Sequence, residues 1–280
     1  METADLGMTS GRRLIRRHSL TVRLSHWLNV LFMTVLLFSG LQIFNAHPAL
    51  YWGQYGADSD PSFFSLEAVE QGDITRGVTR VGGLSFDTTG ILGVSNVDGE
   101  PTARGFPAWI TLPSYQDLAT GRRWHFFFAW LFVVNGLIYL GYGLLTRHFR
   151  RDLLPTTDEL APAHLAQEIV DHARLRFPRG EKARRYNALQ KLTYLLVIFV
   201  ALPLMIATGL TMSPGFDAFA PWLIDLFGGR QSARTLHFIT ASSLVAFVVV
   251  HVAMVLVSGV FNNMRSMITG RYAIQTEPKP

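Results

Sequence analysis

The sequence contains no cysteine among its 280 residues. This absence excludes disulfide bonds, iron–sulfur clusters held by thiolates, and haem attached covalently through a C-x-x-C-H motif. Charged residues are also scarce, at 16%, while hydrophobic residues make up 49% of the chain. A chain with so few charges and so many apolar residues is not typical of a soluble globular protein.

The apolar residues are concentrated in four blocks, and the mean hydropathy is +0.24. A membrane span needs about 20 mostly apolar residues, and each block is long enough. The first block is longer than the apolar core of a signal peptide and no small-residue cleavage site follows it, so we expect it to remain uncleaved. The blocks predict an all-α membrane protein, a bundle of four transmembrane helices at 24–44, 122–146, 191–212 and 234–261.

The net charge is +5, but the basic residues flank the apolar blocks, which favours a role in membrane topology over binding to nucleic acid. Arginine and lysine are concentrated in segments 1–23 and 147–190. The positive-inside rule therefore places these two segments and the tail 262–280 in the cytoplasm. Segments 45–121 and 213–233 then lie in the periplasm. We expect a multi-pass protein of the bacterial inner membrane with both termini cytoplasmic.

The segment 45–121 is a long periplasmic insertion between the first and second helices. It is acidic and rich in glycine, aspartate, threonine and proline. Connections of this length are usually functional or disordered. Its aromatic stretch 105–115 (GFPAWITLPSY) favours an ordered structure, either a cap that lies on the membrane surface or a docking site for a partner protein.

The nine histidines fall into two sets. For the five outside the spans we expect surface or interfacial roles: His18, His47, His148, His164 and His172. The other four lie in the spans or at their ends: His26, His125, His237 and His251. An imidazole inside a membrane is costly, so its presence there indicates a functional site.

The spacing of the four span histidines predicts two pairs. His237 and His251 are fourteen residues apart, which is close to four helical turns, so both lie on one helix face about 21 Å apart along the axis. The predicted orientation puts His125 at the periplasmic depth of His237, and His26 at the cytoplasmic depth of His251. Two bis-histidine pairs at two depths predict two non-covalent haem groups. Because both axial positions are filled, electron transfer is favoured over oxygen chemistry.

Zinc is the main alternative use of clustered histidines. A zinc site needs its ligands to converge on one point, whereas these histidines are separated by about four turns of helix. The pattern therefore favours haem.

Small residues near the histidines agree with a flat cofactor. Gly40 lies fourteen residues after His26 and shares its helix face, and Gly136 lies on nearly the same face as His125. A glycine lets a backbone approach a macrocycle closely. Ordinary packing of small residues between membrane helices explains the same pattern, and this alternative stays open.

Three arginines lie beside the predicted ligands at the edges of the membrane and could pair with haem propionates. The positive-inside rule explains Arg23 equally well. It does not explain Arg122 and Arg123, which are on the predicted periplasmic side.

Several stretches of the chain match a known family: Arg17–Asn29 (RHSLTVRLSHWLN), Ser39–Gly40, Arg122–His125 (RRWH), Tyr186–Lys191 (YNALQK), and His237 with His251. With these features the chain resembles the bacterial cytochrome b561 superfamily. In particular, it resembles the b-type cytochrome subunits of nickel–iron hydrogenases, formate dehydrogenase and thiosulfate reductase.

The resemblance implies two haems b, with the inner one held by His26 and His251. It also implies a quinone site near that inner haem. In the formate dehydrogenase subunit a Y-N-x-G-Q-K motif contributes to this site, and Asn187 and Gln190 match it. Leu189 stands where that motif has glycine.

With its long outer insertion, the chain also resembles cytochromes b that are paired with periplasmic molybdopterin oxidoreductases. The predicted function is therefore electron transfer between the quinone pool of the respiratory chain and such a partner, with no catalytic residue beyond the quinone site. Two alternatives stay open. One is a stand-alone superoxide:quinone oxidoreductase of the same superfamily, using the outer haem edge with Arg122 and Arg123. The other is a transporter or structural membrane protein with incidental histidines.

Overall fold

The computed structural model describes residues 8–9, 12–57, 60–176 and 186–275. The chain forms two compact units, which are described separately. The first unit comprises residues 1–28, 135–203 and 243–280, and the second comprises residues 29–134 and 204–242.

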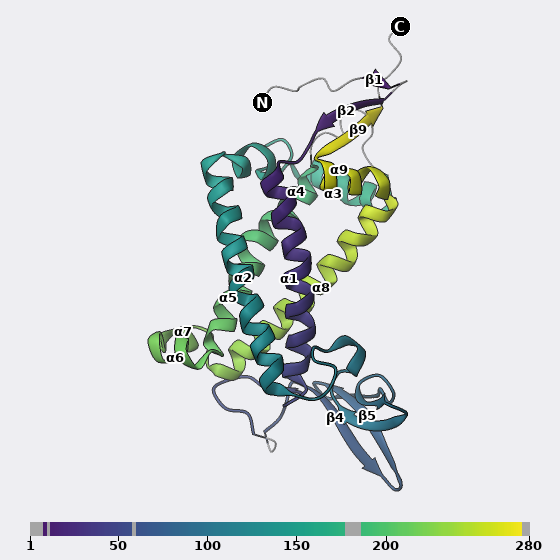
Figure 1. Ribbon diagram of the computed structural model, residues 1–280, viewed down its shortest axis with the longest axis vertical. Coiled ribbons are helices and arrows are strands. Elements are labelled where there is room, and N and C mark those ends of the chain that lie inside the picture. Colours follow the sequence, from purple (N-terminus) through teal and green to yellow (C-terminus); the bar gives the residue numbers. More distant parts are fainter. Residues whose placement is uncertain (1–7, 10–11, 58–59, 177–185, 276–280) are drawn as a thin grey trace. The chain divides into compact units, whose positions relative to one another are not determined.

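Four helices in the described residues are long and apolar enough to cross a membrane (Figure 1). They are α1 (Leu20–Phe44), α2 (Leu118–Leu145), the continuous stretch Ala188–Thr211, and α8 (Arg230–Val257). This finding confirms the prediction of a mostly helical protein with four spans, and the chain is a multi-pass membrane protein.

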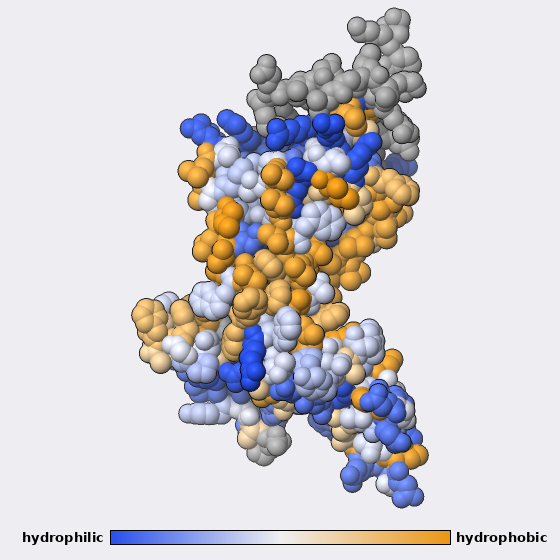
Figure 2. All heavy atoms as spheres, viewed as in Figure 1, coloured by the Kyte–Doolittle hydropathy of each residue, from blue (hydrophilic) through white to orange (hydrophobic). Residues whose placement is uncertain are grey.

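On the face that Figure 2 shows, apolar side chains cover much of the helical region. On α2, Phe127, Trp130 and Leu137 are each at least 60% exposed. In water such an apolar surface would favour aggregation, because soluble monomers rarely expose large apolar patches. Hydrocarbon tails of lipid are the environment that suits these side chains.

The third span consists of three pieces: α4 (Ala188–Leu196), the π-helical turn η4 (Val197–Ala201) and α5 (Leu202–Thr211). The π-helical turn lies just before Pro203, which has no backbone N–H to donate to the preceding turn. Proline removes a helical hydrogen bond, and a π-turn is one of the local adjustments that accommodate the loss.

The first unit contains the segments that flank the spans. Strand β2 (Arg12–Arg16) pairs antiparallel with β9 (Arg271–Gln275), and β1 (Met8–Thr9) pairs with β2. Helix α9 (Val260–Thr269) leads into β9. The chain before the first span is thus hydrogen-bonded to the chain after the last one. The sequence does not predict these strands, because strands this short show little alternation of apolar and polar residues.

The loop between the second and third spans also belongs to the first unit. It contains the π-helical turn η2 (Phe149–Leu153) and the helix α3 (Pro162–Ala173). The basic residues at 177–185 lie outside the described residues.

In the second unit, the segment between α1 and α2 is built largely of strands. Strands β3 (Ala49–Leu50), β4 (Phe64–Gln71), β5 (Ile74–Val81) and β6 (Leu84–Asp87) form an antiparallel sheet in that order, and β7 (Gly93–Val97) pairs with β8 (Glu100–Arg104). A short 3-10 helix, η1 (Ala108–Ile110), follows. The short helices α6 (Pro214–Phe219) and α7 (Trp222–Leu226) precede α8.

Two-residue turns connect β4 to β5, β5 to β6 and β7 to β8. In the β7–β8 hairpin, Val97 pairs with Glu100, and both central residues, Asp98 and Gly99, have positive φ. An Asp-Gly turn with positive φ at both positions matches the right-handed twist of paired strands. The strands explain how this segment folds, while its role as a membrane cap or as a docking site stays a prediction.

A small aromatic core joins this segment to the helices of the second unit. Phe44 at the end of α1 packs with the buried Leu50 and Leu66 and with Phe238 of α8. Arg234 of α8 is also placed here: its guanidinium donates to the carbonyl oxygens of Ala49 (2.7 Å) and His47, and it lies over the Phe44 ring. The strand segment is therefore anchored beside the N-terminal turns of α8.

A second arginine organises the loop that follows β8. Arg104 is buried, and its guanidinium donates to Phe106 O (2.8 Å), Ser114 O (3.0 Å) and Thr111 Oγ1 (2.9 Å). Burial lowers the pKa of Arg104. The three acceptors belong to the aromatic stretch 105–115, so this one side chain holds that stretch in an ordered loop.

Candidate functional site

The four histidines of the spans meet as two pairs, one in each unit. In the second unit, His125 of α2 and His237 of α8 have ring centroids 6.3 Å apart. In the first unit, His26 of α1 and His251 of α8 have ring centroids 6.4 Å apart. These are the two pairs that the sequence analysis expects.

The spacing of the rings fits two imidazoles on one metal ion. A metal–imidazole bond is about 2 Å long and the ring centroid lies about 1.1 Å further on, so two axial rings place their centroids about 6.2 Å apart. Within the described residues, no group of three or more histidine, cysteine, aspartate or glutamate side chains could hold a metal ion. Two ligands suit the axial positions of a haem and are too few for a structural zinc site.

Two hydroxyl groups contact the rings of the His125–His237 pair. Ser39 Oγ of α1 lies 3.1 Å from His125 Nδ1, and Thr208 Oγ1 of α5 lies 3.0 Å from His237 Nδ1. When Nδ1 is engaged in this way, Nε2 is the nitrogen available to a metal.

A glycine follows each of these hydroxyl residues and lies against the same ring. A Cβ atom at Gly40 would be 3.3 Å from His125 Cε1, and one at Gly209 would be 3.2 Å from His237 Cε1. Both distances are tighter than most Cβ contacts, so the two glycines form a cradle that larger residues would fill. A Cβ at Gly136, in contrast, would meet no atom within 4 Å.

The His26–His251 pair has different surroundings. His26 meets the edge of Trp27, and His251 stacks on Phe247 with centroids 5.8 Å apart. His26 Nδ1 is buried and has no hydrogen-bond partner among the described residues. Trp27 Nε1 donates to Met267 O (3.1 Å), which fastens α1 to α9 beside this pair.

The three arginines predicted to lie near haem propionates have different surroundings. Arg23 donates to Ile268 O at the end of α9. Arg122 lies over the Phe126 ring at 5.6 Å, and Arg123 is exposed. Their roles toward propionates stay predictions. The sequence alone does not single out Arg234, which lies one turn before His237 and whose guanidinium donates to backbone carbonyl groups.

The two predicted quinone residues form a helix cap. Asn187 is the N-cap of α4: its side chain accepts from Gln190 N at 2.8 Å, and the Gln190 side chain accepts from Asn187 N at 3.4 Å. This reciprocal arrangement is a capping box. It accounts for the spacing of the two residues structurally, and their contact with quinone stays a prediction.

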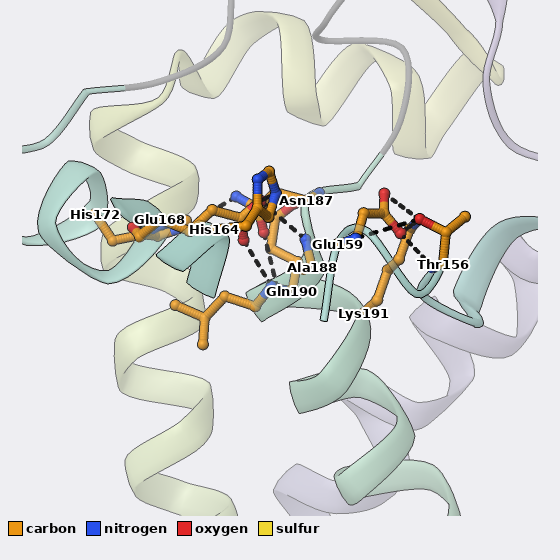
Figure 3. A network of polar contacts seen from close by, with 10 residues as sticks. Thr156, Glu159, His164, Glu168, His172, Asn187, Ala188, Gln190 and Lys191 are labelled. Carbon is orange, nitrogen blue, oxygen red and sulfur yellow. Dashed lines mark hydrogen bonds and ion pairs between the residues drawn. The ribbon is translucent and has the colours of Figure 1, made fainter. Parts of the chain in front are cut away.

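A polar network surrounds this cap (Figure 3). Glu168 of α3 accepts from the backbone N–H groups of Ala188 (3.2 Å) and Leu189 (2.9 Å), so a carboxylate lies at the positive end of the α4 dipole. Asn187 Nδ2 contacts His172 Nε2 at 3.2 Å. Lys191 is buried and bonds both carboxylate oxygens of Glu159 at 2.8 Å. The start of the third span is therefore firmly held on its loop.

His18, for which we expected a surface or interfacial role, is half-buried against Tyr186. The two rings stack with centroids 6.3 Å apart, and the guanidinium of Arg17 lies over the Tyr186 ring. Burial and, to a smaller extent, the positive charge of Arg17 together lower the pKa of His18 to about 4. His18 is therefore neutral at pH 7.

This lowered pKa predicts that acid destabilises the fold. Between pH 6.5 and 4 the unfolded chain binds a proton at His18 that the folded chain does not bind, so stability falls as the pH falls, by roughly 2 kcal/mol from this group. Thermal denaturation of wild type and His18→Gln in detergent, at pH 7, 5.5 and 4.5, measures the effect. The variant should lose less stability over this range, and identical pH dependence in the two proteins would contradict the assignment.

A family model described as prokaryotic cytochrome b561 matches residues 17–270. Among curated proteins, a candidate protein-methionine-sulfoxide reductase subunit named YedZ1, from Azospira oryzae, is 35% identical over 149 residues, which are 53% of this chain and 70% of that protein. No solved structure matches the chain.

Proposed function

The chain belongs to the prokaryotic cytochrome b561 family, and from this premise we propose that it carries two non-covalent haems b and passes electrons between quinone and a periplasmic oxidoreductase. The observation that carries the proposal is the meeting of four span histidines as two pairs, with ring centroids 6.3 and 6.4 Å apart. Haem supplies one-electron chemistry where it binds, and the protein supplies its ligands and surroundings.

The histidines would hold each iron from both sides. A haem with two imidazole ligands has no open axial position, so substrate cannot bind the iron and the site is suited to electron transfer. His26 and His251 would hold the inner haem, and His125 and His237 the outer one. Because α8 contributes one ligand to each pair, a single helix belongs to both proposed sites.

We place the quinone site in the first unit, beside the His26–His251 pair. Asn187 and Gln190 belong to this unit and match the family motif. One N–H of the Asn187 amide donates to His172 Nε2, because His172 Nδ1 donates to Glu168 O, and the second N–H of the amide is the donor that we propose for quinone. Quinone oxygens need such donors when they are reduced.

We place the partner on the periplasmic side, at the acidic strand segment of the second unit. A protein from Azospira oryzae to which this chain is similar is named as a candidate subunit of a protein-methionine-sulfoxide reductase. Because that name describes one subunit of a reductase, we propose that this chain also works with a separate oxidoreductase, and that the partner is a molybdopterin enzyme. The arginine distribution favours an inner-membrane location with both termini cytoplasmic.

Optical spectroscopy of the purified protein tests the proposal. A reduced-minus-oxidised spectrum with pyridine haemochrome quantitation should give two haems b per chain, and added quinol should reduce them. A protein without haem would end the proposal and would favour the transporter alternative. If dithionite reduces two haems but quinol does not, the assignment as a di-haem cytochrome would stand and the assignment of quinone as its substrate would be wrong.

Substitution at Asn187 tests the quinone residues. Asn187→Ala removes both the cap and the amide, whereas Asn187→Ser keeps a side-chain oxygen that caps a helix nearly as well. If the amide contacts quinone, both variants should reduce haem with quinol about tenfold more slowly at unchanged haem content, as expected for the loss of roughly one hydrogen bond to a reacting group. Slow reduction in the alanine variant alone would assign the residue to capping.

A further inference from the structure

We infer that Ser39 and Thr208 are positioning residues for the His125–His237 pair. Each hydroxyl holds its histidine in the tautomer that leaves Nε2 free for iron. Each also makes the imidazole a stronger electron-pair donor to that iron. The inference rests on the proposed haem function. It adds that the chain gives the two haems different midpoint potentials.

The direction of the hydrogen bonds follows from the number of protons. A hydroxyl group has a single proton to donate. Ser39 Oγ lies 2.6 Å from Val35 O, and a carbonyl oxygen can only accept, so the hydroxyl proton is used there. The contact of 3.1 Å between Ser39 Oγ and His125 Nδ1 must then be donated by Nδ1–H.

A second contact at His125 leads independently to the same tautomer. His125 Nδ1 is 3.1 Å from Leu36 O, which again can only accept. Nδ1 therefore carries the proton and Nε2 carries a lone pair, which is the state in which a neutral histidine binds a metal.

The same arrangement occurs at His237. Thr208 Oγ1 lies 2.7 Å from Leu204 O, four residues earlier, and 3.0 Å from His237 Nδ1. Ser39 and Thr208 are both fully buried, and each is followed by a glycine that lies against the histidine ring. Two helices of the second unit thus hold two histidines with the same hydroxyl–glycine pair. Chance packing would rarely produce the arrangement twice around one proposed metal.

The other pair differs at the matching atom. His26 Nδ1 is buried and has no hydrogen-bond partner in the part of the chain that the structure describes. A hydrogen bond donated by Nδ1–H raises the basicity of a metal-bound imidazole and fixes its orientation. A more basic ligand stabilises ferric over ferrous iron, so Ser39 and Thr208 lower the potential of the haem they serve and leave the other haem unchanged.

Redox titration of the full-length, haem-loaded protein tests the inference. We expect Ser39→Ala and Thr208→Val each to raise the midpoint potential of one haem, with a larger rise in the double variant and no shift of the second haem. The affected haem should also bind more weakly, by about tenfold, which is the low end for loss of such a partner. Ser39→Thr and Thr208→Ser keep the hydroxyl and should restore both properties.

Two control variants separate this role from helix stability. Thr34 of α1 and Thr240 of α8 make the same bond to a carbonyl four residues earlier, each at 2.7 Å, and the described structure shows neither hydroxyl on a histidine. Thr34→Ala and Thr240→Val should leave both potentials at their wild-type values.

The outcomes distinguish this inference from the proposed function. Wild-type protein without haem would end both. Wild type with two haems, neither of which shifts in the double variant, would overturn the inference alone. Equal shifts in the control variants, or equal shifts of both haems, would overturn it as well, because the effect would then be general.

Discussion

His237→Ala is expected to remove one of the two haems and to leave the other in place. With His237 gone, the proposed haem would lose one of its two iron ligands, and we expect the remaining bond to His125 to be too weak to hold it without covalent attachment. His26 and His251 belong to the other unit, so their pair should keep its ligands. The haem-to-protein ratio should therefore fall by about half, since we propose that each pair holds one iron.

Pyridine haemochrome quantitation and a redox titration measure this loss. His251→Ala should remove the complementary haem, so that the two variants together account for both redox transitions. The matched control is His47→Ala, because His47 lies in the second unit but stacks on Tyr51 instead of facing another histidine. Loss of haem from the His47 variant to the same extent would contradict the assignment of His125 and His237 as the ligand pair.

The double substitution Gly40→Leu/Gly209→Leu is expected to remove the same haem as His237→Ala. Even a methyl group at these positions would lie within 3.3 Å of a histidine ring. Alanine there requires the ring to move by a few tenths of an ångström, whereas leucine needs space that the ring now occupies. The displaced rings would no longer face one another across an iron.

Haem content and thermal stability of the glycine variants should be measured together. Gly141→Leu is the control, because Gly141 is also a glycine of a membrane helix but a Cβ there meets no atom within 4 Å. It should keep both haems. The single variants Gly40→Ala and Gly209→Ala should show a smaller loss, graded with side-chain size. A fully loaded leucine double variant would contradict the cradle.

The spans and the histidine pairs could be predicted because their signals are local. A run of about 20 apolar residues identifies a span without knowledge of its neighbours, and a spacing of fourteen residues places two histidines on one helix face. The pairing then follows from depth alone. The family match bears out the resemblance drawn from the same residues.

The contacts that orient the histidines could not be predicted, since Ser39 and His125 are 86 residues apart. The sequence does contain one signal for these contacts. In two different spans a hydroxyl residue is followed by glycine, at Ser39–Gly40 and at Thr208–Gly209. The capping box at Asn187 and Gln190 was also readable, because Asn followed three residues later by Gln is a local pattern.

The strands between α1 and α2 were not predicted, although turn signals were available. Asp98–Gly99 and Gly82–Gly83 each stand between paired strands, and such dipeptides are typical of two-residue hairpin turns. In β5 the two buried residues are Gly77 and Thr79, neither of which has a large apolar side chain, and β6 has no buried residue. Alternation of apolar and polar residues is therefore weak, and the turns were the better evidence.

The sharing of α8 between the two pairs has a consequence for biogenesis. Helix α8 is the last of the four spans to leave the ribosome, and it brings both His237 and His251. A nascent chain that has inserted only its first three spans offers one histidine of each pair. On the proposed assignment, neither pair could ligate a metal before the fourth span enters the bilayer. Cofactor loading would then be a late step, which only chains with all four spans inserted could reach.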